Sequence, residues 1–282
     1  MGRLRRLTDS NLFVTIVWIA ALVCVWEIAA SYIETVKRTP ENVLPHLWQI
    51  GQSVVSTKPV AGGQTALQIV LTAAAATLSR AGLGFVIGAG LGFVLALLMK
   101  LSGIVEKIAF PYLMIIQMIP ILGMAPIVLG ITGDIGVSRV AIAAILTFYP
   151  VAANTLAGLK STEPEKDSLF RSYAATLPQT YVKLYIPVAL PYLFTGLKIA
   201  APLAVTASIL VDTLQGDGGL GCMLSQSLKH AMSIFVFWQI VFLSAIVGVL
   251  SLNAMVWLER LVLPNERRKG KWNKASEAES AA

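Results

Sequence analysis

The chain has 282 residues, of which 56% are hydrophobic and only 13% are charged, and its formal net charge is +7. A soluble domain carries about 25% charged residues, so this composition indicates an integral membrane protein. The positive charge could suggest a nucleic-acid partner. However, the cations cluster at the ends of apolar runs, which is typical of membrane topology.

The first apolar run covers Leu12 to Ala30 and follows a short segment, residues 1–11, that contains three arginines. The run could be a signal peptide, because Ile28–Ala30 loosely resembles a cleavage site. Its length is nearer the ~20 residues of a spanning helix than the ~7–15 apolar residues of a signal sequence. We therefore predict an uncleaved first span after a cytoplasmic N-terminus, with Glu27 reaching the outer interface.

A polar stretch, residues 31–63, is expected outside the membrane, with a short amphipathic helix around Val43 to Val54. The chain is then helix-prone from Gln64 to Leu98, which is longer than one bilayer at about 1.5 Å rise per residue. We expect a tilted or partly extramembrane helix whose true span is Ala81–Leu98. Arg80 would then lie near the outer interface or face a partner helix.

Three glycines in the second span, Gly84, Gly88 and Gly92, recur at every fourth position. Gly82-Leu83-Gly84 superficially resembles a dinucleotide-binding fingerprint, but no strand precedes it and its third glycine is misplaced. Small residues at this spacing let a second helix approach closely. The pattern therefore predicts a helix–helix contact.

The third span is predicted over Ile108–Ile131 and contains Pro111, Pro120 and Pro126. Within a membrane, an interrupted helix is tolerated only where protein or a wet cavity covers it. The prolines therefore indicate one of two things. The helix is kinked for packing, or it lines the pathway with Gln117 and Met118 facing inward. The remaining spans are predicted over Val137–Leu159, Val188–Val211 and Ile234–Val262.

The topology follows from the uneven distribution of Lys and Arg. Segments assigned to the cytoplasm carry 15 of these cations, and segments assigned outside carry 5. The positive-inside rule supports cytoplasmic termini and six spans in a permease domain of residues 12–262, followed by a cytoplasmic, disordered tail of residues 263–282. The predicted fold class is an all-α polytopic membrane protein with six transmembrane helices and a cytoplasmic coupling helix in the loop 160–187.

No motif for covalent chemistry is present. The chain has no G-x-x-x-x-G-K-[ST] phosphate loop, H-E-x-x-H or G-x-S-x-G, and Cys24, Cys222, His46 and His230 do not form a metal-ligand pattern. We expect no enzyme activity, metal or cofactor in this chain. An ion-driven carrier usually needs carboxylates within its spans, and only Asp212, at a helix end, is a candidate. The energy source is therefore expected in another protein.

The loop 160–187 contains a short polar helix of the kind that docks in a groove of a soluble partner. The small side chains of Ala174 and Ala175 would let this helix seat closely. Pro178 is expected to end the helix, because the residue before a proline avoids the helical region. Two later prolines would fix the angle at which the fifth span begins. An ordinary amphipathic connector is the alternative interpretation.

Ser172-Tyr173-Ala174 and Val188-Ala189-Leu190-Pro191 resemble the cytoplasmic EAA loop of ABC importer permeases. That signature reads E-A-A, three residues, Gly, nine residues, I-x-L-P. Ser172 stands in place of the Glu of this signature, and Pro178 stands in place of its Gly. Three explanations of these departures stay open: the chain is one half of a heterodimer, it belongs to a divergent substrate branch, or its ATPase partner is non-standard. The resemblance, which covers about residues 15–262, is to the subgroup that imports nitrate, sulfonates, taurine and pyrimidine thiamin precursors.

This resemblance implies an inner-membrane permease subunit of an ATP-driven importer that forms the pathway for a small organic solute. It also implies a second permease in a homodimer or heterodimer, two ATPase subunits that bind ATP and Mg, and an extracytoplasmic substrate-binding protein. The implied partners include the lipid bilayer and no nucleic acid. The residues implied in coupling to the ATPase are Arg171, Ser172, Tyr173, Ala174, Ala175, Thr176, Leu177, Pro178, Leu190 and Pro191.

Candidates for the substrate pathway are residues in or beside the spans. Few fixed charges line the spans, which favours an uncharged or delocalised organic substrate over a compact ion. Two other functions remain open: an ion-gradient-driven secondary transporter and a non-transporting membrane scaffold subunit. The pathway candidates are Gln117, Met118, Asn154 and Asp212.

Overall fold

The computed structural model describes residues 11–38, 43–61, 63–216, 218–229 and 234–263. The expectations for residues 1–10, His230 and residues 264–282 concern parts of the chain outside the described residues. Apart from one two-stranded hairpin, the described elements are helical, as predicted. In chain order they are α2 (Asn11–Val36), α3 (Leu47–Val55), β1 (Pro59–Ala61), β2 (Gln64–Thr65), α4 (Ala66–Leu101), α5 (Gly103–Met118), α6 (Ile121–Thr132), α7 (Ile135–Lys160), α8 (Pro164–Ser172), α9 (Leu177–Thr180), the π-helical turn η2 (Tyr181–Tyr185), α10 (Ile186–Gln215), α11 (Leu220–Leu228) and α12 (Ile234–Val262).

Among the described residues, five helices are long and apolar enough to cross a membrane. They comprise α2, α4, α7 and α12, together with one continuous helix that includes α10 and runs over Leu177–Leu214. The pair α5 and α6 makes a sixth span if it is counted as one, although its two halves are bent by 109°. The predicted count of six spans is confirmed when α5 and α6 are counted together as one span.

The break between α5 and α6 shows which of the three prolines interrupts the third span. Pro120 stands at the N-cap of α6, and Ile119 before it is extended, with ψ 125°. A residue before proline is driven out of the helical region, and proline has no N–H to continue the ladder. Pro111 and Pro126 remain inside α5 and α6. The span predicted over Ile108–Ile131 is therefore two helices.

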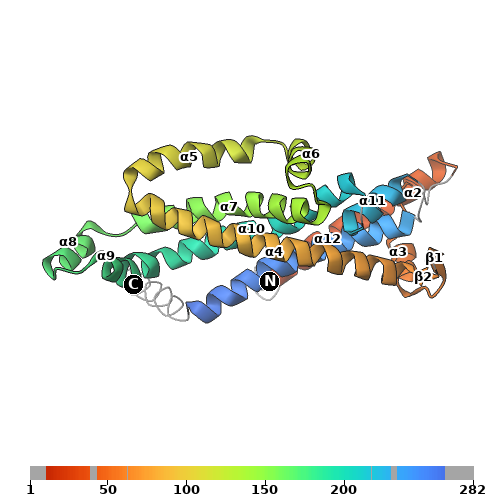
Figure 1. Cartoon of the computed structure of the whole chain (residues 1–282). Helices are drawn as coiled ribbons and strands as arrows, with labels where there is room; N and C mark the ends of the chain where they lie inside the picture. The colour runs from red at the N-terminus through yellow and green to blue at the C-terminus, as the bar shows by residue number, and fades with distance from the viewer. Residues whose placement is uncertain (1–10, 39–42, 62, 217, 230–233, 264–282) are drawn as a thin grey trace, which may run out of the picture. The chain divides into compact units, whose positions relative to one another are not determined.

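The chain divides into two compact units. One contains the described residues up to Ala73 together with Met223–Phe242, and the other contains Ala74–Cys222 together with residues from Leu243 onward. In the larger unit, α4, α7 and α10 run side by side (Figure 1). A buried apolar cluster fills the space between its helices and consists of Ala96, Met99, Leu113, Ala152, Leu156, Leu159 and Ala189.

The glycine repeat of α4 packs directly on α7. A Cβ added to Gly84 would lie 2.7 Å from the carbonyl oxygen of Val140, and one added to Gly92 would lie 2.7 Å from that of Phe148. A Cβ at Gly88 would collide with the hydroxyl of Thr147. The predicted close helix approach is confirmed, and only residues without a side chain fit at these positions.

In the smaller unit, a polar clamp joins α2 to the start of α3. His46 contacts Glu27 Oε2 through Nδ1 at 2.5 Å and Glu34 Oε1 through Nε2 at 3.1 Å. The other oxygen of Glu27 accepts a hydrogen bond from the backbone N–H of Leu47 at 3.0 Å, in the first turn of α3. A carboxylate at a helix N-terminus is stabilising. Glu27 and its partners therefore fix where the predicted amphipathic helix begins.

We predict that Gly88→Leu destabilises the larger unit. The new side chain must enter space occupied by Thr147, and overpacking of this kind costs about 1–3 kcal/mol or more. Thermal unfolding of the purified chain in detergent would measure the loss. Gly90→Ala is the matched control, because a Cβ at Gly90 meets nothing within 4 Å. Equal melting temperatures for the two variants would contradict the packing argument.

We also predict that the α2–α3 clamp weakens as pH rises. The pKa of His46 is raised, chiefly by its hydrogen bond to Glu27. Because the folded pKa exceeds the ordinary value of about 6.5, the contribution of the clamp is complete below that value and is lost as pH rises through the folded pKa. Amide hydrogen exchange in α3, corrected for intrinsic rates, should show the loss of protection. His46→Gln should abolish this dependence, and an unchanged profile in the variant would exclude His46 as its origin.

Candidate functional site

The 160–187 segment begins with α8, whose ends follow ordinary helix rules. Pro164 lies in the first turn, where its missing N–H is not needed, and Glu165 and Asp167 place negative charge near the N-terminus. Arg171 places positive charge in the last turn. The helix ends at Ser172. The prediction that Pro178 ends the polar helix is therefore wrong.

A tight turn, residues 173–176, separates α8 from α9. Ala174 has a φ of 48°, and its N–H donates to the carbonyl of Arg171 at 2.9 Å. The N–H of Ala175 donates to Phe170 at 3.0 Å. A left-handed conformation at a residue other than glycine costs about 1–2 kcal/mol, so contacts of the surrounding turn must compensate for it. The reversal of the chain thus depends on Ala174.

Pro178 begins a helix instead of ending one. It lies in the first turn of α9, the position at which proline is favoured. From there the helix continues through η2 into α10, and the N–H of Ile186 donates to the carbonyl of Tyr181, five residues earlier. Pro187 and Pro191, the two later prolines expected to fix the angle at which the fifth span begins, therefore lie inside a helix that has already begun, because Leu177–Leu214 forms one helix. Leu190 and Pro191 lie within this helix.

Asp167 anchors α8 to the π-helical turn. Its Oδ1 accepts a hydrogen bond from the Tyr185 hydroxyl at 2.5 Å, and its Oδ2 contacts Arg171 Nη2 at 3.0 Å. The bond from Tyr185 is the main reason that the pKa of Asp167 is lowered. The ammonium group of Lys100, on α4, lies 4.4 Å from the centre of the Tyr185 ring. The polar helix is therefore tied to the continuous helix and to α4.

Large apolar side chains on this segment face outward. Tyr173 is 78% exposed, Leu177 is 66% exposed and Val182 is 64% exposed. Beside them lies a hollow of about 330 Å³. Exposed aromatic and aliphatic side chains around a hollow are typical of a surface that a protein partner covers. The hollow is lined by Leu169, Phe170, Tyr173, Ala175, Gln179 and Lys183.

The four pathway candidates lie in different environments. Gln117 and Met118 are exposed at the end of α5, immediately before the break. Asn154 is half-buried in α7 and donates to the Pro150 carbonyl at 2.7 Å. Asp212 is completely buried in α10. No contact recorded among the described residues joins these four side chains, so their assignment to a pathway stays a prediction.

Asp212 is the centre of a buried charged cluster formed by three helices. Its Oδ1 lies 3.0 Å from Arg80 Nη1 on α4 and 3.0 Å from Arg139 Nε on α7. Its Oδ2 accepts a hydrogen bond from the Thr77 hydroxyl at 2.6 Å. The side chain of Arg139 is 1% exposed and that of Arg80 is 19% exposed. Asp212 accepts hydrogen bonds from Thr77 and Arg80 and forms an ion pair with Arg139, and such pairing lowers the cost of burying its charge.

The glycine-rich loop after α10 closes over the cluster. The N–H of Leu220 donates to Thr77 Oγ1 at 2.9 Å, so this hydroxyl serves both Asp212 and the loop. Gly219 has a φ of 93°, and a Cβ there would collide with the Asp212 carboxylate. At Gly221 a Cβ would lie 2.7 Å from the backbone nitrogen of Thr213. These glycines allow the loop to approach the carboxylate closely.

This cluster is not among the features predicted from the sequence. Arg139 is one of the five cations predicted to lie outside the membrane, and the structure places it in the second turn of α7, buried against Asp212. Arg80 was expected to reach an interface or to face a partner helix, and the second of these alternatives is confirmed. The predicted topology contained a usable signal, because it placed Arg80, Arg139 and Asp212 at the outer ends of three spans. Charges of opposite sign at one depth are expected to pair.

The fold is that of a polytopic α-helical membrane protein, and a solved structure shares it. The crystal structure of an amino acid ABC transporter with histidines superposes with a TM-score of 0.58 at 20% identity, covering 69% of this chain and 94% of that chain. The model of the family described as binding-protein-dependent transport system inner membrane component matches residues 88–264. The chain therefore belongs to this family, whose members are multi-pass permeases of the inner membrane.

Named relatives agree with this membership. The formylaminopyrimidine transport permease protein ThiX of Halalkalibacterium halodurans is 32% identical over 88% of this chain and 94% of its own length. The aliphatic sulfonates transport permease protein SsuC of Bacillus subtilis, described as putative, is 28% identical over 78% and 84%. The nitrate import permease protein NrtB of Leptolyngbya laminosa is 25% identical over 88% and 86%. The chain is thus an ABC importer permease, which decides against a secondary carrier and a scaffold subunit.

We predict that Asp212→Asn destabilises the folded chain by about 3–5 kcal/mol, because it leaves the buried Arg139 and the half-buried Arg80 without their carboxylate. Denaturant unfolding in mild detergent would measure the change. Glu163→Gln is the control, because Glu163 pairs with Lys166 at the surface and such pairs contribute about 0–1 kcal/mol. Similar unfolding midpoints for the two variants would show that the cluster does not stabilise the fold.

Proposed function

We propose that this chain forms the translocation pathway of an ATP-driven importer for a small organic solute. A second permease, identical or different, would complete the pathway. Two ATPase subunits would bind ATP and Mg, and an extracytoplasmic binding protein would deliver the solute. In the proposed topology the permease domain is residues 12–262, and both termini and the 160–187 segment lie in the cytoplasm.

The exposed apolar surface of the 160–187 segment is the observation that supports coupling. Tyr173 and Leu177 are exposed at the point where the tight turn meets a helix that continues to Leu214. A helix of this length transmits a displacement along its axis because it contains no loop that could absorb it. We propose that an ATPase subunit covers Tyr173, Leu177 and the adjoining hollow.

Closure of the ATPase pair on ATP would displace this surface and tilt the helix that carries it. The same helix contacts α7, since a Cβ at Gly196 would lie 2.7 Å from the Pro150 carbonyl. Close packing of this kind transmits strain, so a tilt of one helix displaces the other. ATP must bind more tightly to the state with closed ATPases in order to shift the population toward it.

The substrate we propose is a small organic solute with a delocalised ring. The relative at 32% identity is named for formylaminopyrimidine, and others are named for sulfonates and nitrate. Few fixed charges lie in the spans, which favours an organic ring such as formylaminopyrimidine over a compact anion such as nitrate. Formylaminopyrimidine is accordingly the first solute to test.

The proposed function is tested by reconstituting the chain in proteoliposomes with an ABC ATPase and a substrate-binding protein from the same organism. We expect uptake of the cognate solute that requires ATP and the binding protein. Uptake by the chain alone under an ion gradient, without ATP, would overturn the proposal. The same result would revive the secondary-carrier interpretation.

For the coupling surface, we predict that Leu177→Asp and Ala175→Asp each lower ATP-dependent uptake about tenfold or more, because a charge buried in the interface is expensive. Leu177 is exposed and Ala175 is half-buried in the wall of the hollow, so membrane insertion and thermal stability should be unchanged. Lys166→Gln, on the exposed face of α8, is the matched control. Normal uptake and normal ATPase co-purification with both Asp variants would refute the docking role.

A further inference from the structure

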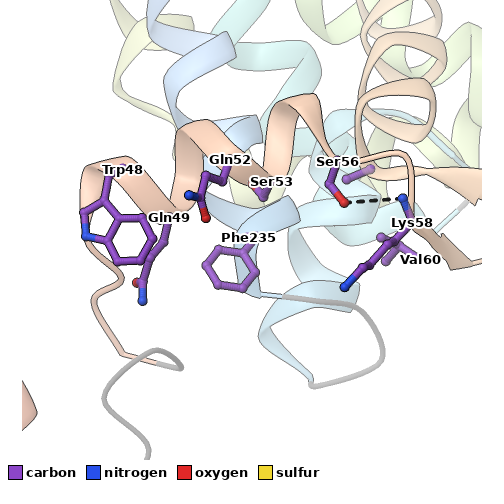
Figure 2. Close-up of a pocket in the computed structure, with 9 residues that line it drawn as sticks. Trp48, Gln49, Gln52, Ser53, Ser56, Lys58, Val60 and Phe235 are labelled. Atoms are coloured by element: carbon purple, nitrogen blue, oxygen red, sulfur yellow. Dashed lines mark hydrogen bonds between the residues drawn. The ribbon is translucent and has the colours of Figure 1, made fainter.

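A groove of about 490 Å³ runs along α3 in the smaller unit (Figure 2). Its walls come from one face of α3, from the hairpin strand β1 and from the first turns of α4 and α12. This volume lies within the roughly 300–1,000 Å³ of typical small-molecule sites. The lining residues are Trp48, Gln49, Gln52, Ser53, Ser56, Lys58, Val60, Ala66 and Phe235.

The chemistry of the walls selects one class of ligand. Trp48 and Phe235 supply aromatic surface, and the amide of Gln52 can both donate and accept hydrogen bonds. Lys58 supplies positive charge at one end of the groove, and no carboxylate is among the lining residues. A planar ring that carries hydrogen-bond acceptors matches these walls, whereas an organic cation does not.

The groove is held in shape by contacts behind its walls. Gln239 on α12 donates through Nε2 to the hydroxyl of Ser53 at 2.8 Å, which joins α3 to α12. The backbone N–H of Lys58 donates to Ser56 Oγ at 3.3 Å, which fixes the path of the chain from α3 into β1. The clamp between His46 and Glu27 holds the start of α3. A site that is already formed loses less entropy when a ligand binds.

We propose that this groove is a receiving subsite for a small planar organic solute, neutral or anionic, with its ring against Trp48 and Phe235 and an acceptor toward Lys58. The inference rests on the proposed function, because the predicted topology places residues 31–63 outside the membrane. The groove then faces the side from which the binding protein releases solute. It adds a solute contact outside the spans, distinct from the pathway candidates.

The test uses the full chain in lipid nanodiscs with formylaminopyrimidine as the probe, measured by equilibrium dialysis and by saturation-transfer NMR. We expect saturable binding, with Trp48→Ala weakening it about fivefold or more through lost stacking and Gln52→Ala weakening it about fivefold through a lost hydrogen bond. Both side chains are exposed, so these variants should fold normally. Val55→Ala, on the same helix and 81% exposed outside the groove, should bind as the unmodified chain does. Taurine and nitrate, which lack a ring, should bind more weakly.

Two results would overturn the inference. One is probe binding that is absent from the unmodified chain, or that has the same affinity in Trp48→Ala and Gln52→Ala as in the unmodified chain. The other is weakened binding of the substrate-binding protein by these variants with probe affinity unchanged, which would make the groove a protein-docking surface. ATP-dependent uptake by the unmodified importer is measured in parallel. If the importer takes up solute and Trp48→Ala leaves its KM unchanged, the subsite is refuted and the proposed function stands. If the unmodified importer shows no ATP-dependent uptake, the proposed function itself is refuted.

Discussion

The buried carboxylate of Asp212 is the constraint on which the larger unit depends. It contacts Arg80 on α4 and Arg139 on α7 at 3.0 Å each, and it shares the Thr77 hydroxyl with the backbone of Leu220. Each arginine would be costly to bury without this partner. One side chain therefore fixes the mutual depth of three spans and the position of the loop after α10. Hydrophobic contact could not supply this registration in a lipid environment, where lipid tails are as apolar as the helix surfaces.

Close packing between helices is the second interaction that holds the larger unit together. Glycines on α4 admit the backbone of α7, and Gly158 on α7 admits α10, where a Cβ would lie 2.9 Å from the Cα of Ala189. Near the cytoplasmic end of the proposed topology, Lys198 on α10 pairs with Glu259 on α12 at 2.5 Å. Polar pairs and backbone-to-backbone contacts are the two interactions that remain effective between helices in a membrane. The larger unit uses both, at separate positions along its helices.

The spans and a close helix contact on the glycine face of α4 could be predicted from the sequence, because apolar length and glycine spacing act locally, but the identity of the partner, α7, could not. The pairing of Arg80 with Asp212 is not visible in any local pattern, because 132 residues separate them, and only their common depth in the predicted topology indicates that they meet. Proline positions were predicted only in part. The sequence shows three prolines in the third span but does not show which one interrupts it. The structure shows that Pro120 does so, while the other two remain inside helices. Pro178 initiates a helix because Ala174 has already reversed the chain. The groove required strands and helices from distant parts of the sequence, so no local pattern could indicate it.

The helix that begins at Leu177 carries the proposed docking surface at one end and Asp212 near the other, about 53 Å apart at 1.5 Å per residue. A push at Leu177 therefore reaches the charged cluster through a continuous backbone. Separating Asp212 from an arginine would cost about 3–5 kcal/mol, which is a large fraction of the stability of a domain. Tilting α4, α7 and α10 as one block leaves these ion pairs intact. The geometry thus favours rigid-body rocking of this block, with the change in packing concentrated at its outer surfaces and at the break between α5 and α6, where the backbone is already interrupted.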